Sequence, residues 1–133
     1  MGMKANKKHN INEEGFIYVG IRAKRRVFGR SKVGTTEKPL KKRISCIRSK
    51  GEKDFMVLAY IRLVNCTKSQ LELVESAMKV ELEKRYQHIQ NDHFEYKMAN
   101  KEEENKLFVD SAIKYGTEAC QWKHLNYEVV YVD

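Results

Sequence analysis

The sequence predicts an α/β protein in which a small antiparallel sheet is flanked by helices. Two short runs of β-branched and aromatic residues, 15–21 and 31–34, lie close together in the chain, as the strands of a hairpin do. A nearly continuous apolar run at 55–65 is typical of a central strand that is covered on both faces. Segments with apolar residues at helical spacing follow the second and the third run.

The size and composition favour a single folded domain in a reducing compartment. With 133 residues, 41% of them hydrophobic, the chain can bury a substantial core. No apolar run approaches the roughly 18 residues that a membrane span needs. Cys46, Cys66 and Cys120 are odd in number and far apart in sequence, which argues against a disulfide framework or a zinc knuckle. We therefore expect a cytoplasmic protein with no membrane partner.

Positive charge is concentrated in the first part of the chain. The net formal charge is +8, and residues 1–50 contain 15 Lys or Arg against 3 Asp or Glu. Residues 101–133 contain 4 basic and 7 acidic residues. A basic front half predicts a surface that meets a polyanion, and the alternative is a basic protein with solvated lysines. Residues 1–14 are predicted to be a disordered basic arm.

A first helix is predicted after the second strand. Thr35 or Thr36 can cap it, and Pro39 suits its first turn. Its apolar stripe consists of Leu40, Ile44 and Ile47. Arg43 lies on or beside this stripe, where a guanidinium is costly to bury without a partner.

A second helix is predicted over about 69–87, with Ser69 and Glu72 as its capping box. Its apolar stripe consists of Leu71, Val74, Met78, Leu82 and Tyr86. Glu75 falls inside this stripe, and a carboxylate at the edge of a core is expensive unless it meets a cation or a hydrogen-bond donor. Glu72 has a structural explanation as the cap partner, whereas Glu75 has none of equal quality.

The remaining chain is predicted to complete the core and extend it. Phe94 and Tyr96 should anchor residues 91–96 onto the core formed by 15–98. An extension, 99–133, is expected to contain an acidic helix over 100–115, which Gly116 ends, and a last strand over 127–132.

The order of the polar residues resembles the GIY-YIG nuclease superfamily. A first motif reads Phe16-Ile17-Tyr18, and thirteen residues separate it from a second motif, Lys32-Val33-Gly34. Arg43 and Glu75 follow on the two predicted helices. Lys in place of the first Tyr of the second motif resembles a short branch found in phages and bacteria. The resemblance covers residues 15–96.

The resemblance implies a metal-dependent DNA endonuclease that hydrolyses phosphodiester bonds. Glu75 would hold Mg²⁺ (or Mn²⁺), and Arg43 would clamp the scissile phosphate. Tyr18 would orient or deprotonate the water, while Lys32 would either lower the pKa of Tyr18 or act as the base itself. The structural alternatives are a buried salt bridge between Arg43 and Glu75, and a packed strand aromatic for Tyr18.

Two positions depart from the superfamily pattern. The His that often follows four residues after the Arg is Ile47 here. The late Asn corresponds best to Asn91, with Asp92 or Glu95 as alternatives. His93 lies nearest to the predicted site among the histidines and would be an outer partner or a proton-transfer group.

Contacts with the DNA backbone are expected from the basic residues around the site. They are Arg22, Lys24, Arg25, Arg26 and Arg30 in the 22–30 connection, and Lys41, Lys42 and Arg48 in the first helix. For the 22–30 connection, a solvated turn is an equal alternative. Cutting both strands of a duplex would require a homodimer, with the C-terminal region as the contact, or two encounters.

Two functions of other classes compete with the nuclease. One is a non-catalytic DNA- or RNA-binding protein on the same fold, which would keep the basic surface without the metal site. The other is a regulator that binds an acidic protein.

Overall fold

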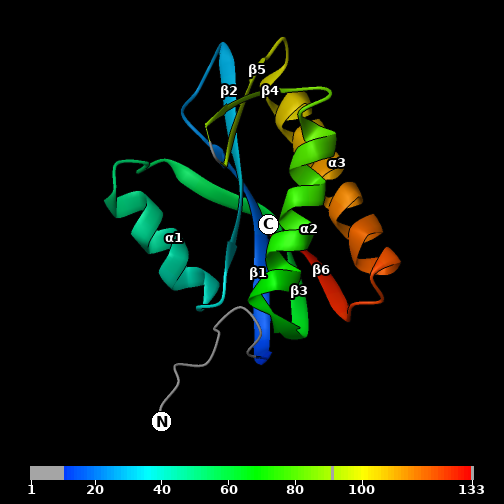
Figure 1. Cartoon of the computed structure of the whole chain (residues 1–133). Coiled ribbons are helices and arrows are strands. Elements are labelled where there is room, and N and C mark those ends of the chain that lie inside the picture. Colours follow the sequence, from blue (N-terminus) through cyan, green and yellow to red (C-terminus); the bar gives the residue numbers. More distant parts are fainter. Residues whose placement is uncertain (1–10, 91, 133) are drawn as a thin grey trace.

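The computed structural model describes residues 11–90 and 92–132, in which one six-stranded sheet is covered by three helices (Figure 1). The elements are β1 (Ile11–Arg22), β2 (Phe28–Thr36), α1 (Leu40–Ser49), β3 (Phe55–Thr67), α2 (Lys68–Leu82), β4 (Gln87–Gln90), β5 (His93–Lys97), α3 (Lys101–Trp122) and β6 (Tyr127–Tyr131). The strand order is β4-β5-β2-β1-β3-β6, and every neighbouring pair is antiparallel. The predicted α/β class is confirmed, including the added C-terminal helix and strand.

The sheet separates two apolar clusters. Figure 1 shows α1 on one side of the sheet and α2 and α3 on the other. Ile17 and Val19 of β1 point into the larger cluster, beneath α2 and α3, while Tyr18 between them joins a smaller cluster with Ile47 and Phe55. This division follows from strand geometry, because successive side chains point to opposite faces. Both faces of β1 are therefore covered.

The N-terminal boundary differs from the prediction. β1 begins at Ile11, so residues 11–14 of the expected basic arm belong to the sheet. They are held there because Ile11 pairs with Thr67 and Glu14 pairs with Val64. The rest of that arm, 1–10, lies outside the described residues.

The start of α1 also differs. Thr35 and Thr36 remain in β2, where they pair with Ile17 and Phe16. They therefore do not cap α1, which begins after Pro39 without a side-chain cap. Backbone pairing with β1 explains why these threonines extend the strand.

α2 is capped by a different pair from the one predicted. The Oγ1 of Thr67 accepts a hydrogen bond from the Gln70 amide nitrogen (3.1 Å), and the Gln70 Oε1 accepts one from the Thr67 amide nitrogen (2.8 Å). This is the reciprocal arrangement predicted for Ser69 and Glu72. The pair that forms it, Thr67 and Gln70, lies two positions earlier in the chain. The helix ends at Leu82 rather than near residue 87.

Gly116 does not end α3, which continues to Trp122. It is buried against the sheet, and a Cβ at this position would lie 2.4 Å from Ile61 Cδ1. The glycine thus permits close packing between α3 and β3 instead of stopping the helix. After α3, β6 confirms the predicted last strand.

The short hairpin of β4 and β5 was not predicted as a pair of strands. β4 pairs only with β5 among the described strands, while β5 also pairs with β2 over Phe28–Lys32.

In the described part of the chain, no helix is long and apolar enough to span a membrane.

Candidate functional site

The side chain of Tyr18 lies across the neighbouring strand at Gly34. The two residues are paired between β1 and β2, so they share one face of the sheet. A Cβ on Gly34 would lie 2.3 Å from the Tyr18 hydroxyl oxygen, closer than any side chain can approach. The tyrosine is fully buried. Glycine is therefore needed at position 34, because only its missing side chain lets the phenol hydroxyl reach over β2.

The strand pairing on the outer edge of β2 ends near this hydroxyl. Among the described residues, the pairing between β2 and β5 ends at Lys32 and His93. One further contact follows, in which the Val33 amide nitrogen donates to the Asp92 carbonyl oxygen (3.0 Å). Gly34 and the residues after it in β2 therefore have no β5 strand partner among the described residues, although Gly34 itself is buried.

Arg43 brings a cation to the Tyr18 hydroxyl. Its Nε donates a hydrogen bond to that oxygen (3.2 Å) from α1, one turn before Ile47. Because the oxygen accepts this bond, the hydroxyl proton remains free to be donated elsewhere. Within the described residues, the terminal nitrogens of Arg43 have no hydrogen-bond or ion-pair partner. A phosphate oxygen could therefore bind to them.

The pKa of the Tyr18 hydroxyl is raised, mainly because the group is buried. The hydrogen bond and the charge of Arg43 act in the opposite direction, and the charges of Asp92 and Glu75 raise the pKa further. The hydroxyl is therefore protonated at neutral pH. In this state it is a hydrogen-bond donor rather than a base.

Glu75 reaches the same region from α2, on the other side of the sheet. Its Oε2 lies 3.4 Å from the Lys79 Nζ, which also lies 2.5 Å from the Asp92 Oδ1. Burial raises the pKa of Glu75, the charge of Lys79 lowers it, and the charges of Asp92 and Glu72 raise it. Among the described residues, Lys79 is the ion-pair partner of Glu75, so the alternative of an Arg43–Glu75 salt bridge is not formed.

Glu72 is a residue that sequence reasoning assigned to the wrong role. Because Gln70 completes the cap of α2, Glu72 has no capping function. Its Oε1 is buried and has no hydrogen-bond partner among the described residues. It precedes Glu75 by three positions, so both lie on one side of α2, and its charge helps to raise the pKa of Glu75. The spacing of three between these two glutamates was the available signal.

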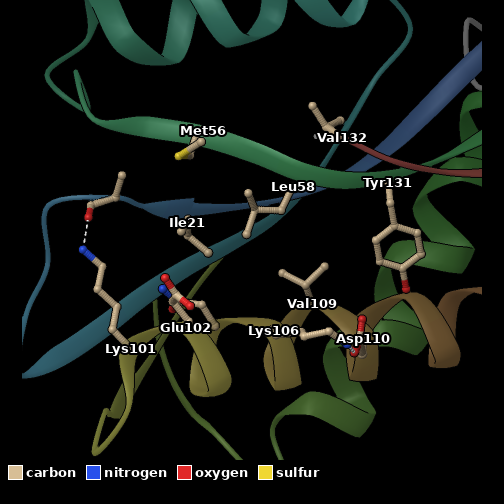
Figure 2. Close-up of a pocket in the computed structure, with 12 residues that line it drawn as sticks. Ile21, Met56, Leu58, Lys101, Glu102, Lys106, Val109, Asp110, Tyr131 and Val132 are labelled. Carbon is tan, nitrogen blue, oxygen red and sulfur yellow. Dashed lines mark hydrogen bonds and ion pairs between the residues drawn. The ribbon is translucent and has the colours of Figure 1, made fainter.

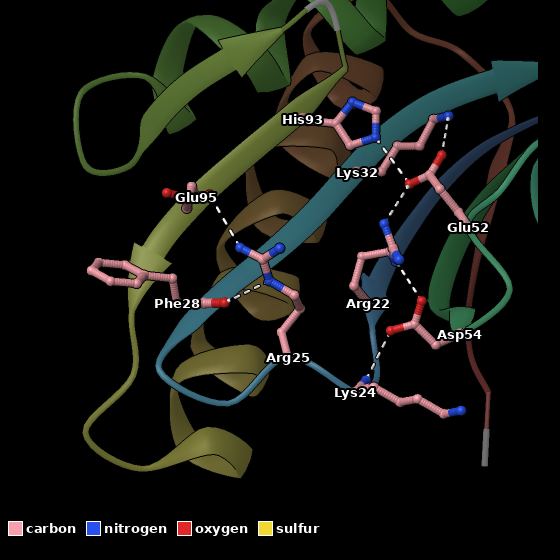
Figure 3. A network of polar contacts seen from close by, with 9 residues as sticks. All are labelled: Arg22, Lys24, Arg25, Phe28, Lys32, Glu52, Asp54, His93 and Glu95. Carbon is pink, nitrogen blue, oxygen red and sulfur yellow. Dashed lines mark hydrogen bonds and ion pairs between the residues drawn. The ribbon is translucent and has the colours of Figure 1, made fainter.

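Lys32 points to the same face of the sheet as Tyr18, but its ion-pair partner is Glu52 rather than Glu75. Its Nζ lies 3.7 Å from the Glu52 Oε2. Glu52 also lies near His93 and Arg22, as Figure 3 shows. Arg43, not Lys32, is the cation that lowers the pKa of Tyr18. That part of the expectation for Lys32 is corrected.

The basic residues of the 22–30 connection are only partly free. Arg22 Nε is 2.5 Å from Asp54 Oδ1, and the Lys24 backbone nitrogen donates to Asp54 Oδ2 (Figure 3). Arg25 donates to the Phe28 carbonyl oxygen and pairs with Glu95 (3.3 Å). These contacts hold the β1–β2 turn in place, so it is not the fully solvated turn that was the alternative for residues 22–30.

Other predicted DNA-contact residues keep their charges available. The side chains of Lys24, Arg26, Lys41 and Lys42 are exposed and, within the described residues, are not paired. Arg48 is exposed, although its Nε donates to the Phe55 carbonyl oxygen (2.8 Å). Arg30 has a buried Nε without a hydrogen-bond partner among the described residues.

The two departures from the superfamily pattern have different outcomes. Ile47 is buried in the small cluster beneath α1, where it packs with Phe55. Asn91 lies outside the described residues. Of its two alternatives, Asp92 lies beside Lys79 and Glu75, whereas Glu95 is engaged by Arg25.

A separate apolar groove of about 750 Å³ lies between α3 and the sheet, with Ile21 and Leu58 on the sheet side and Val109 on α3 (Figure 2). Tyr131 and Val132 border it at the end of β6. None of the predicted catalytic residues lines this groove. Among the described residues, no group of three or more His, Cys, Asp or Glu side chains is arranged to hold a metal.

Comparison with known proteins assigns no family. No family model, curated protein or solved structure matches this chain. The resemblance to the GIY-YIG superfamily therefore stays a prediction, and the function is inferred from the geometry around Tyr18.

Proposed function

We propose that the protein is a metal-dependent DNA endonuclease that hydrolyses phosphodiester bonds, as the resemblance to GIY-YIG nucleases implies. One observation carries this proposal. Tyr18 of β1 accepts a hydrogen bond from Arg43 of α1, and the charge of Glu75 of α2 is close enough to raise the pKa of the Tyr18 hydroxyl. Gly34 beneath the Tyr18 hydroxyl and the hydrogen bond from Arg43 hold that hydroxyl in a fixed position.

Arg43 and Tyr18 supply two of the functions that phosphodiester hydrolysis needs. The terminal nitrogens of Arg43 would bind the scissile phosphate and offset its developing charge. Tyr18, held by Arg43 Nε, would donate a hydrogen bond to the attacking water or to a phosphate oxygen and so orient the reactants. Lys32 remains the candidate for the base or for a further phosphate contact.

The carboxylates on α2 fit a divalent metal ion. Mg²⁺ keeps several waters and is often held by only one or two protein carboxylates. Glu75 is partly desolvated, and the Glu72 Oε1 beside it is buried without a hydrogen bond among the described residues. These are oxygen donors that a dication would satisfy. Glu75, with Glu72, would hold Mg²⁺ or Mn²⁺, which when bound supplies Lewis-acid stabilisation of the leaving oxygen.

The charge distribution supports DNA as the substrate. Exposed cations of the β1–β2 turn and of α1 border the sheet face that carries Tyr18. Each phosphate contact of this kind makes binding weaker as salt rises. The three free cysteines fit a reducing compartment, so we place the reaction in the cytoplasm.

The decisive experiment is a nicking assay on supercoiled plasmid in Mg²⁺ and in EDTA. We expect nicking in Mg²⁺ that EDTA abolishes and that Glu75→Gln eliminates. The matched control is Glu81→Gln on the same helix, because the ion-pair partner of Glu81 among the described residues is Lys84 (3.1 Å). Nicking by Glu75→Gln at the rate of the control would refute the proposed site.

A non-catalytic DNA- or RNA-binding protein is the second candidate. The ion pair between Lys79 and Glu75 favours it, since a lysine already neutralises the proposed metal ligand. This candidate predicts salt-sensitive binding without nicking, and equal binding by wild type and Glu75→Gln with or without Mg²⁺. Any Mg²⁺-dependent nicking that Glu75→Gln abolishes would exclude it.

A further inference from the structure

A second group of basic side chains lies on the face of the sheet that carries Tyr18. Arg22 at the end of β1, Lys32 in β2 and His93 at the start of β5 converge on Glu52 (Figure 3). The Glu52 Oε1 lies 3.1 Å from His93 Nε2 and 3.8 Å from an Arg22 terminal nitrogen. Its Oε2 lies 3.7 Å from Lys32 Nζ. Three strands thus direct basic groups at one carboxylate.

Glu52 fills this position loosely. Among the described residues, only His93 lies within hydrogen-bonding distance of Glu52; Lys32 and the Arg22 terminal nitrogen lie farther away, and Arg22 also pairs with Asp54. Lys32 is 8% exposed, and Glu52 is its one ion-pair partner among the described residues. An ammonium this deeply buried is costly, and a single long contact compensates it poorly. The site therefore has binding capacity that Glu52 does not use.

Glu52 is carried by a loop that can release it. It lies between α1 and β3, directly after Gly51, whose φ of 115° places it in a region that favours glycine. A side chain at Gly51 would meet no heavy atom within 4 Å, so this part of the loop borders open space. Asp54, further along the loop, stays anchored through Arg22. The carboxylate of Glu52 can therefore leave without detaching β3.

We propose that Arg22, Lys32 and His93 form a binding site for a nucleic-acid phosphate beside the scissile one, which Glu52 occupies in the free protein as a competitor. This inference rests on the proposed function. Lys32 and Gly34 are two positions apart on β2, or about 7 Å, so the phosphate bound here would be a neighbour of the one cut. A phosphodiester carries one negative charge, as Glu52 does, so the exchange preserves the charge balance of the buried cations.

Binding of a labelled DNA duplex in EDTA, followed by fluorescence anisotropy, tests the competition without cleavage. We expect Glu52→Gln to lower the Kd about tenfold, because no carboxylate has to be displaced. The matched control is Glu14→Gln, which also removes one charge from a carboxylate paired with an arginine, Arg62 (2.6 Å). It should change the Kd less than about threefold. In a Lys32→Met background the gain from Glu52→Gln should largely disappear.

Equal gains from Glu52→Gln and Glu14→Gln would overturn the inference and leave the proposed function standing. The absence of salt-sensitive DNA binding by every variant would overturn both. A measurement on the wild-type protein covers the case in which Glu52→Gln does not fold. The imidazole resonances of His93, followed by NMR, should shift as duplex is added, because its partner Glu52 is replaced. Unchanged resonances at saturating DNA would refute the exchange.

Discussion

Replacement of Gly34 by alanine tests whether the crossing of Tyr18 over β2 matters for function. The added Cβ would lie 2.3 Å from the Tyr18 hydroxyl oxygen and 2.5 Å from the ring carbon that bears it. Neither atom is the end of a flexible chain, because the ring is fully buried and packs edge-on against Phe55. The phenol must tilt as a unit, and the hydrogen bond from Arg43 would be lost.

The expected loss of stability is modest, whereas the expected loss of activity is large. Overpacking by one methyl group typically costs about 1–3 kcal/mol, which corresponds to a fall in Tm of about 4–12 °C for a domain of this size. A displacement of about 1 Å in a reacting group can reduce a rate by about a hundredfold. We therefore expect Gly34→Ala to be folded at the temperature of the assay and to nick plasmid at about one hundredth of the wild-type rate.

Gly116→Ala is the control for this experiment. Its added Cβ makes a similar clash, 2.4 Å from Ile61 Cδ1, but lies between α3 and the sheet on the opposite face. It should lower the Tm while leaving the nicking rate near that of the wild type. If Gly34→Ala nicks as fast as Gly116→Ala at a temperature where both are folded, the Tyr18 crossing is not part of a catalytic site.

Four further predictions concern the site and the fold. Arg43→Lys keeps the charge but loses the fork, so nicking should fall about a hundredfold with little change in Tm, as measured by single-turnover kinetics and calorimetry. Burial raises the pKa of Glu75, so the protonated carboxyl stabilises the fold below its ordinary pKa, and this contribution is lost as pH rises through the folded value. Glu75→Gln should accordingly raise the Tm at pH 7, but not at about pH 3.5, where both side chains are neutral. Thr67→Ala should destabilise the protein by about 1 kcal/mol in urea unfolding, because it removes the cap of α2. Burial raises the pKa of Cys120 to about 11, so a thiol reagent should label the half-buried Cys46 first in the native protein, as mass spectrometry of the peptides would show.

Patterns that depend on neighbours in sequence predicted the fold well. The β-branched and aromatic run of β1, the nearly continuous apolar run of β3 and the apolar stripe of α2 reflect burial, which local sequence patterns record. Gly116 shows where this reasoning fails. A glycine near the end of a helical pattern is usually a stop signal, but here it marks a contact with Ile61, which is far away in sequence.

The sequence predicted the individual residues of the candidate site but not which partners they contact. Arg43 and Glu75 were selected because each is a charged group among apolar neighbours, and such groups need partners, whereas Tyr18 was selected from the resemblance to the first GIY-YIG motif. Which partners they take depends on register between strands and on the angle of the helices, so Lys79 rather than Arg43 pairs with Glu75. Glu52 carried no sequence signal, because a glutamate in a polar loop is ordinary until the fold places three cations around it.

The central claim is that Tyr18, Arg43 and Glu75 form one catalytic unit. Single-turnover nicking rates of Tyr18→Phe, Glu75→Gln and the double variant test this claim most directly, because phenylalanine preserves the buried ring and removes only the hydroxyl. Residues that act as a unit give strongly non-additive effects. We expect the nicking rate of each single variant to fall at least about a hundredfold, and the double variant to be hardly slower than the slower of the two single variants. A nicking rate of Tyr18→Phe equal to that of the wild type would contradict this expectation. So would a double variant whose rate falls by the product of the two single-variant factors.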